Sequence, residues 1–281
     1  MENPTKKTHL LIFATIIVSC LVCLSSAKPN SASEGFSYDP CSERGPQHWG
    51  DLEEQWAKCK NGKMQSPVAL SLWNATFNGY LGQLRRNHWP AIAILENNGH
   101  QVVVEWIENA GSIKINGVNY YLQDYHWHHP SEHTQDGKTY PLELHMVHTN
   151  NNPNVTNKIA VISILYKFGP PDPFLRLIEG DIKRLNIEGG ERWLGTVDPR
   201  LAWPMYSWSE TYFRYMGSLT TPPCTEGVIW TVMKKIQTVS PYQVELLKQA
   251  VVEEKNARSL QNINRREIFY FGPLLGRKSA A

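Results

Sequence analysis

Histidines are concentrated in one short part of the chain, and their spacing suits metal binding. Six of the ten histidines lie between positions 126 and 148. Side chains two residues apart in a β-strand point to the same face, so His126 and His128 present two imidazoles to one side and Trp127 points to the other. Glu143 and His145 repeat this spacing after an Asp-Gly turn. If the two strands pair, three imidazoles converge on one point.

Three converging imidazoles predict an open zinc site formed by His126, His128 and His145. Three neutral nitrogen ligands plus water are the arrangement of catalytic zinc, whereas structural zinc is closed by four protein ligands that commonly include Cys. We therefore expect a Zn²⁺ cofactor with a free position where water is activated. A ligating histidine usually donates its far N–H to a carboxylate or carbonyl. Glu143 and Asp124 are placed to accept from His145 and His126, respectively.

Other interpretations of these histidines are weaker. An isolated His-X-His pair is more often structural than metal-binding, but the Glu-X-His pair on the next strand favours a metal. His129 and His148 should point away from the metal by strand alternation, and we interpret both as structural. The spacing of His126, His128 and Glu132 also fits the start of a cupin metal motif, in which Glu132 is a ligand. The glycine that should follow is misplaced, and a second cupin motif is not found.

The elements that must position these residues are short β-strands. Runs rich in Val, Ile, Tyr and Trp alternate with Asn-Gly and Asp-Gly turns. They are residues 91–96, 101–107, 113–115, 123–129, 142–148, 159–166 and 228–234. Helices are predicted only at 241–252, where Ser240 is the N-cap and Pro241 the first helical residue, and at 174–185. The expected fold class is mainly β (α+β with minor helices), a single domain around a large, mostly antiparallel twisted sheet.

Composition and charge limit the classes of partner. The chain has 281 residues, of which 41% are hydrophobic and 19% charged, as in ordinary globular proteins. Its net charge is +2, and it has no concentrated run of Lys and Arg. A nucleic-acid binder needs a basic face, so we expect no nucleic-acid partner. A small molecule is the expected partner, and the sequence gives no indication of the oligomeric state.

Residues 1–27 are typical of a signal peptide. Lys6 and Lys7 precede the apolar stretch 10–24, and Ser25-Ser26-Ala27 offers small residues for cleavage after Ala27. The alternative is a membrane anchor, but the stretch falls short of the roughly 20 residues that span a bilayer. We expect a mature domain of residues 28–281 without a membrane partner, secreted by the secretory pathway. The same route to a vacuole or plastid remains an alternative.

Cysteines and glycosylation sequences agree with this route. Two of the five cysteines lie in the predicted signal peptide, which leaves Cys41, Cys59 and Cys224 in an oxidising compartment. Three cysteines predict one disulfide and one remaining thiol, and spacing alone does not choose the pair. Acceptor sequences for N-glycosylation begin at Asn74 and Asn154.

Several segments resemble signature segments of the α-class carbonic anhydrases, in particular the secreted plant type. The longest are residues 123–133, 143–148 and 217–223, and 65–67, 98–100 and 256–258 match further family landmarks in the same order. The resemblance covers about residues 36–272. Residues 82–87 and 238–249 look very like plant tuber storage proteins of the same fold.

The resemblance assigns the zinc ligands to the same three histidines and implies reversible hydration of CO₂ to bicarbonate and a proton. Zn²⁺ lowers the pKa of its bound water to about 7, a value known from carbonic anhydrases and not obtained from this sequence. Thr220 would accept from the bound hydroxide and pass its own proton to Glu132. His100 would correspond to the proton shuttle, a role suited to an unperturbed pKa of about 6.5.

The resemblance also assigns supporting residues. The network behind the ligands would contain Glu143, His133 and Tyr215, with Thr221 at the substrate mouth and an apolar CO₂ pocket lined by Val147, Val161, Leu219 and Trp230. The disulfide would join Cys59 to Cys224, which leaves Cys41 as the odd cysteine. Asp124 departs from the family, which usually carries Gln there, and its charge is expected to slow catalysis at neutral pH. The alternative function is that of a storage protein with residual or secondary activity.

Overall fold

The computed structural model describes residues 35–188, 190–203 and 210–273. The predicted signal peptide, residues 1–27, lies outside the described residues. No helix in the described ranges is long and apolar enough to cross a membrane.

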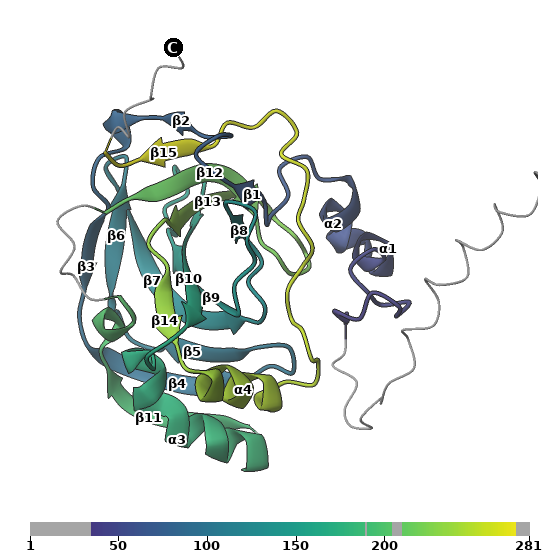
Figure 1. Ribbon diagram of the computed structural model, residues 1–281, viewed down its shortest axis with the longest axis vertical. Helices are drawn as coiled ribbons and strands as arrows, with labels where there is room; N and C mark the ends of the chain where they lie inside the picture. Colours follow the sequence, from purple (N-terminus) through teal and green to yellow (C-terminus); the bar gives the residue numbers. More distant parts are fainter. Residues whose placement is uncertain (1–34, 189, 204–209, 274–281) are drawn as a thin grey trace, which may run out of the picture. The chain divides into compact units, whose positions relative to one another are not determined.

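The described residues form fifteen strands and a few helices (Figure 1). The strands are β1 (Ala69–Leu70), β2 (Thr76–Phe77), β3 (Arg85–His88), β4 (Ala91–Asn97), β5 (Val102–Trp106), β6 (Gly111–Ile115), β7 (Val118–His128), β8 (Thr134–Gln135), β9 (Leu142–Thr149), β10 (Ile159–Phe168), β11 (Glu191–Val197), β12 (Tyr212–Ser218), β13 (Glu226–Met233), β14 (Gln237–Val239) and β15 (Phe269–Phe271). The α-helices are α1 (Trp49–Leu52), α2 (Lys58–Asn61), α3 (Pro173–Glu188) and α4 (Pro241–Ala250), with 3₁₀ turns η2 (Glu54–Trp56), η3 (Gly79–Leu81) and η4 (Pro199–Ala202).

Within the described ranges, thirteen strands belong to one sheet. Its main path runs β11-β4-β5-β7-β9-β10-β13-β12-β15-β2, and β6 joins β3 to β7. Most neighbours are antiparallel, but β10 is parallel to both β13 and β14, and β15 is parallel to β2. β1 and β8 form a separate parallel pair. The expected mainly β fold with a large, mostly antiparallel sheet is confirmed.

The two strands that carry the histidine motif are neighbours near the middle of the sheet. β7 and β9 pair antiparallel with His126 opposite His145. The register shifts between Leu122 and Asp124, so an extra residue is inserted just before the motif. From Asp124 onward, alternate side chains of β7 point to opposite faces of the sheet. This register brings the predicted ligands of the two strands together.

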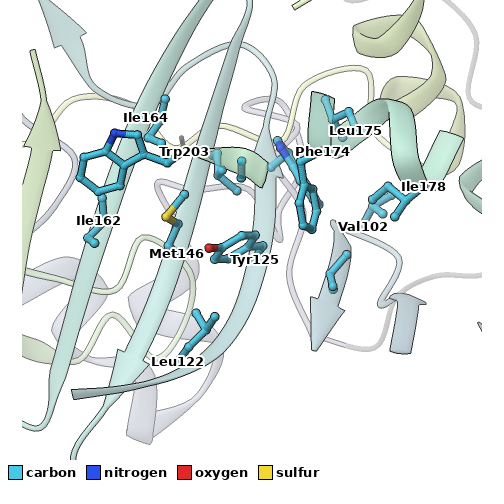
Figure 2. Close-up of a cluster of buried hydrophobic side chains, with 14 of the residues drawn as sticks. Val102, Leu122, Tyr125, Met146, Ile162, Ile164, Phe174, Leu175, Ile178 and Trp203 are labelled. Atoms are coloured by element: carbon cyan, nitrogen blue, oxygen red, sulfur yellow. The ribbon is translucent and has the colours of Figure 1, made fainter. Parts of the chain in front are cut away.

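The two faces of the sheet are packed by different sets of side chains. Tyr125, Met146 and Phe174 belong to the larger core (Figure 2). Trp127 belongs to it too, and by strand alternation this core lies on the face opposite the histidine ligands. The smaller core lies on the histidine face and includes Val161, Phe213, Tyr215 and Trp230. Burial on both faces makes the central strands rigid supports for the polar residues between the two cores.

Helices α3 and α4 cover the larger core at one end of the sheet. α3 packs against β11, β4 and α4 (Figure 1). Ser240 caps α4 by accepting from the backbone N–H of Gln243, and the Gln243 side chain accepts from the backbone N–H of Ser240. Gln243 also donates to Glu179 of α3, which joins the two helices. Both predicted helices are confirmed, including the Ser240 cap and Pro241 at the first position.

The N-terminal part is tied to the rest by a disulfide. Cys59 of α2 is bonded to Cys224, 165 residues later, as the family resemblance implied. Both cysteines belong to a small buried cluster with Tyr38 and Trp49. Cys41 has a further interaction of its own, so the structure does not mark it as a free thiol.

Candidate metal centre

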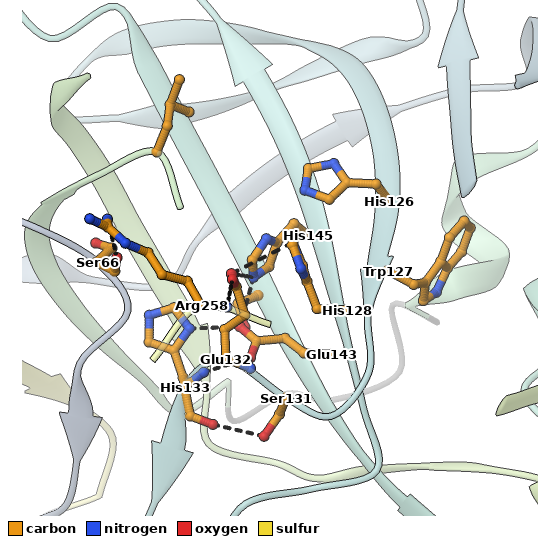
Figure 3. Close-up of polar contacts among 12 residues, drawn as sticks. Ser66, His126, Trp127, His128, Ser131, Glu132, His133, Glu143, His145 and Arg258 are labelled. Carbon is orange, nitrogen blue, oxygen red and sulfur yellow. Dashed lines mark hydrogen bonds and ion pairs between the residues drawn. The ribbon is translucent and has the colours of Figure 1, made fainter. Parts of the chain in front are cut away.

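Three imidazoles converge on one point between β7 and β9. One ring nitrogen from each of His126, His128 and His145 lies within 4.8 Å of the other two (Figure 3). The ring centroids of His128 and His145 are 4.6 Å apart, and each lies 5.2 Å from that of His126. Trp127 points to the other side of the sheet. The structure therefore brings the three predicted ligands together.

An acceptor fixes the orientation of each ring. Nδ1 of His126 lies 2.7 Å from a carboxylate oxygen of Asp124, and Nδ1 of His128 lies 2.6 Å from the carbonyl oxygen of Asn256. Nε2 of His145 lies 2.8 Å from Oε1 of Glu143. A carbonyl or an ionised carboxylate only accepts, so these three nitrogens carry the protons. The opposite nitrogens, Nε2 of His126 and His128 and Nδ1 of His145, keep free lone pairs for a metal.

Burial keeps the two innermost rings neutral. It lowers the pKa of His145 to about 4, against the opposing effect of Glu143, and lowers the pKa of His128 well below its usual value. A metal binds neutral imidazole, so these histidines need not lose a proton at neutral pH to become ligands.

Glu143 is the centre of the network behind the ligands. Its Oε2 accepts from the backbone N–H groups of Glu132 and His133, both at 2.8 Å. Its Oε1 also accepts from Nδ1 of His133 and the hydroxyl of Ser163, both at 2.6 Å. Burial opposes ionisation of Glu143, but His133 and His145 outweigh it and hold the pKa well below its usual range. Glu143 is therefore a carboxylate in this site.

The network continues into the neighbouring strands. Nε2 of His133 accepts from the phenol of Tyr215 at 2.7 Å, and that phenol lies 2.8 Å from the hydroxyl of Ser66. The predicted supporting residues Glu143, His133 and Tyr215 are thus connected by direct hydrogen bonds, which resist rotation of His145.

Glu132 supplies a buried carboxylate oxygen beside the ligands. Its Oε1 accepts from the backbone N–H of Arg258 at 2.8 Å. Its Oε2 has no hydrogen-bond partner among the described residues and lies 3.6 Å from Nε2 of His128 and 3.9 Å from Nε2 of His145. Burial and the charge of Glu143 raise the pKa of Glu132 well above its usual value, although the backbone N–H of Arg258 and the side chain of Thr220 oppose this shift. A divalent cation held by the histidines would stabilise this carboxylate, so the donor set fits such an ion.

Apolar side chains form one wall of the site. Val161 and Trp230 are buried, with Val147 and Leu219 half-buried and packed in the same cluster. The Trp230 ring centroid lies 4.8 Å from that of His145, so this wall adjoins the ligands. Leu219 is followed by Thr220, which is buried, and Thr221, which is half-buried.

His100 lies under the N-terminal segment. Its ring stacks on Phe36 with centroids 4.0 Å apart, and Tyr38 contacts it edge-on at 5.9 Å. Only 8% of the residue is exposed, and burial lowers its pKa. The predicted shuttle histidine is therefore covered in this structure.

Sequence reasoning gave no role in the site to Asn256, Ser163 or Gln101. The side chain of Asn256 accepts from the backbone N–H of His129 and donates to the carbonyl of His100, so one residue links the two segments. The available signal for Asn256 was the resemblance of residues 256–258 to a landmark of the family. A polar residue in the apolar strand β10 was the signal for Ser163, and nothing in the local pattern marked Gln101.

The remaining assigned residues lie away from the ligands. His148 is on the opposite face of β9, with its Nε2 3.1 Å from Nε2 of His88, and His129 is buried beyond the end of β7. Asn74 and Asn154, which begin the glycosylation sequences, are exposed.

Comparison with known proteins gives one family. Residues 44–272 match the family model of the eukaryotic-type carbonic anhydrases. The chain is 45% identical to dioscorin dioA3 of Dioscorea japonica, and the match covers 95% of each chain. It is 38% identical to alpha carbonic anhydrase 7 of Arabidopsis thaliana, and that match covers 98% of this chain and 100% of the relative. The fold also matches a crystal structure of dioscorin complexed with ascorbate, with a TM-score of 0.80 and 45% sequence identity. The match covers 85% of this chain and 99% of the dioscorin chain.

Proposed function

The chain belongs to the eukaryotic-type carbonic anhydrase family, and we propose that it is an active zinc enzyme that catalyses the reversible hydration of CO₂ to bicarbonate and a proton. The observation that carries the proposal is the complete set of donors at one point, His126, His128 and His145, each with its other ring nitrogen bonded to an acceptor. Three histidines and an open position are the arrangement of catalytic zinc. Bound zinc supplies the nucleophile, because it acidifies the water that it holds.

Thr220 and Glu132 orient the nucleophile in this proposal. The side chain of Thr220 lowers the pKa of Glu132, so the two groups interact, and Oε1 of Glu132 accepts from the backbone N–H of Arg258. A threonine hydroxyl has one proton, and an ionised carboxylate only accepts. The Thr220 proton would therefore point to Glu132, which leaves the Thr220 oxygen free to accept a hydrogen bond from the nucleophile and so to orient it toward the substrate.

The wall formed by Val161 and Trp230 suits CO₂, which has no charge and no hydrogen-bond donor. Thr221 lies next to Thr220, at the mouth of the site. We assign the transfer of the proton to His100. Because burial lowers its pKa, a protonated His100 would give up its proton readily, and release to solvent requires the Phe36 ring that covers it to move aside.

We also propose that the chain matures by removal of residues 1–27 and enters the secretory route. The disulfide between Cys59 and Cys224 supports an oxidising compartment. The exposure of Asn74 and Asn154 is compatible with glycans at both positions.

A second candidate function is storage, favoured by the 45% identity to a dioscorin. Dioscorins are storage proteins of this family. A storage role requires no metal centre, so it places no demand on the three histidines. The geometry around His145 therefore favours catalysis as the main function.

The test is CO₂ hydration by the purified mature chain, measured with and without zinc. We compare the wild type with His145→Ala and with His48→Ala, a control because His48 is exposed and outside the site. The wild type and His48→Ala should bind one zinc per chain and be active. His145→Ala should lose most of its zinc and at least a hundredfold in kcat/KM. A zinc-loaded wild type that is no faster than His145→Ala would refute the proposal.

A further inference from the structure

Gln101 places a buried amide against a ligand nitrogen of the metal centre. Its Nε2 lies 3.4 Å from Nε2 of His128, and only 7% of the residue is exposed. Nδ1 of His128 donates to the carbonyl of Asn256, so Nε2 of His128 is an acceptor. The group of Gln101 that faces it is therefore the N–H donor and not the amide oxygen.

The segment that carries Gln101 is held on both sides. The side-chain oxygen of Asn98 accepts from the backbone N–H groups of His100 at 3.1 Å and Gln101 at 2.8 Å. The side-chain amide of Asn256 donates to the backbone carbonyl of His100 at 2.9 Å. The backbone carbonyl of Asn256 accepts from Nδ1 of His128. Asn256 thus fixes the position of Gln101 relative to His128, and the amide is placed before any ligand arrives.

A metal ion at His128 takes the lone pair that the amide now contacts. The N–H of Gln101 then needs another acceptor, since a buried donor without a partner is destabilising. The amide of Gln101 has two N–H groups, and the hydroxyl of Tyr38 interacts with this side chain. Among the described side chains of the apolar wall, the indole of Trp230 is a donor that already bonds the carbonyl of Ser218, so it cannot accept from the other N–H. The acceptor that the chemistry favours is an anionic oxygen of a ligand at the ion.

We propose that Gln101 is a specificity-determining residue that donates its amide N–H to an oxygen of bicarbonate at the metal centre. The inference rests on the proposed function, because bicarbonate reaches this position only beside a bound ion. CO₂ has weak acceptor oxygens, whereas bicarbonate is an anion, and hydrogen bonds to charged groups are roughly twice as strong as neutral ones. Gln101 therefore favours the anion over CO₂.

The test uses the full mature protein loaded with Co²⁺, whose visible spectrum reports ligands at the ion independently of turnover. Bicarbonate is titrated into the wild type, Gln101→Met and Gln101→Leu, both of which remove the amide at similar volume. Gln135→Leu is the matched control, because Gln135 is also a buried glutamine but donates to the carbonyl of Lys234. Affinity for Co²⁺ is measured in parallel.

Both Gln101 variants should bind bicarbonate roughly tenfold more weakly, the effect of one hydrogen bond to a charged group. Gln135→Leu should bind it like the wild type. Co²⁺ affinity should be no weaker in the Gln101 variants, since a donor that competes for His128 is gone. If a folded, cobalt-loaded Gln101 variant binds bicarbonate as tightly as the wild type does, the inference about Gln101 is wrong, but the proposed function still stands. If the wild type takes up no Co²⁺, the proposed function fails, and this inference fails with it.

Discussion

At the residue scale, Asp124 is the charged neighbour of the metal centre. It places a carboxylate 2.7 Å from Nδ1 of His126, where the family resemblance leads us to expect a glutamine. Asp124 lies two residues before His126 and after the β-bulge, so it is on the same face as His126, whereas Leu122 before the bulge belongs to the opposite core. A charged acceptor makes the imidazole a more basic ligand than a neutral amide does. A bound ion would then be held more tightly, and the positive charge that acidifies its water would be partly offset.

Asp124→Gln should therefore weaken zinc binding and shift activity to lower pH. We expect zinc affinity to fall roughly tenfold, which is at the low end of the losses typical when a residue hydrogen-bonded to a metal ligand is replaced. The alkaline limb of the pH–activity profile should move down by up to about one pH unit. Zinc competition with a chelator and CO₂ hydration at several pH values measure the two effects. Asp51→Asn, an exposed control paired with Lys60, should change neither, and an upward shift in Asp124→Gln contradicts the argument.

The sequence predicted the ligands because their spacing is local. A two-residue repeat in a strand is enough to place His126 and His128 on one face, and Glu143 and His145 on the next strand. The acceptor for His128 was not given a role, because Asn256 lies 128 residues away and acts through its backbone carbonyl. A carbonyl has no signature in the sequence. Gln101 was missed for the same reason, since its contact depends on the fold.

At the scale of elements, the strands that the sequence predicted were those with a recognisable pattern of apolar residues between turns. Seven predicted runs correspond to strands β4 to β7, β9, β10 and β13, with shifts at their ends. β12 was missed because it is buried on both faces and shows no alternation. β1, β2 and β8 have two residues each, too few for any period. These short strands form because they pair with segments distant in the sequence, and the strand propensity of their own residues does not predict them.

The disulfide ties the segment between β12 and β13 to α2. Replacing Cys59 and Cys224 by serine should lower the free energy of unfolding by roughly 2–5 kcal/mol, because the unfolded chain gains freedom. Zinc content should remain near one per chain, since the three histidines lie on β7 and β9. Urea unfolding with and without reductant measures the first effect, and metal analysis the second. An unchanged unfolding midpoint on reduction of the wild type contradicts the prediction.

For the whole molecule, buried neutral histidines make stability depend on pH. Burial lowers the pKa values of His88 and His129 to about 4 from a usual value of about 6.5. Between these values the unfolded chain binds protons that the folded chain does not, so the free energy of unfolding falls as pH falls from about 6.5 to about 4. Above about 6.5 these two groups contribute no pH dependence. Each contributes roughly 3 kcal/mol across the window.

Thermal unfolding between pH 4 and pH 7 measures this dependence. The wild type should lose thermal stability steadily below about pH 6.5. Replacing His88 and His129 by glutamine should flatten the decline, whereas replacing the exposed His48 should leave it unchanged. A decline of the same slope in the double variant would show that other groups dominate.

Asn256 has a consequence for the order in which the protein matures. It meets His128 through its carbonyl and Trp127 and His100 through its side chain, although it lies in the C-terminal part of the chain. Arg258, two residues later, supplies the N–H that holds Glu132. A ribosome has therefore made all three ligands long before the groups that orient His128 and Glu132 exist. Metal loading at full affinity is an event of the finished chain, and a nascent chain that stops before residue 256 carries the histidines without the site.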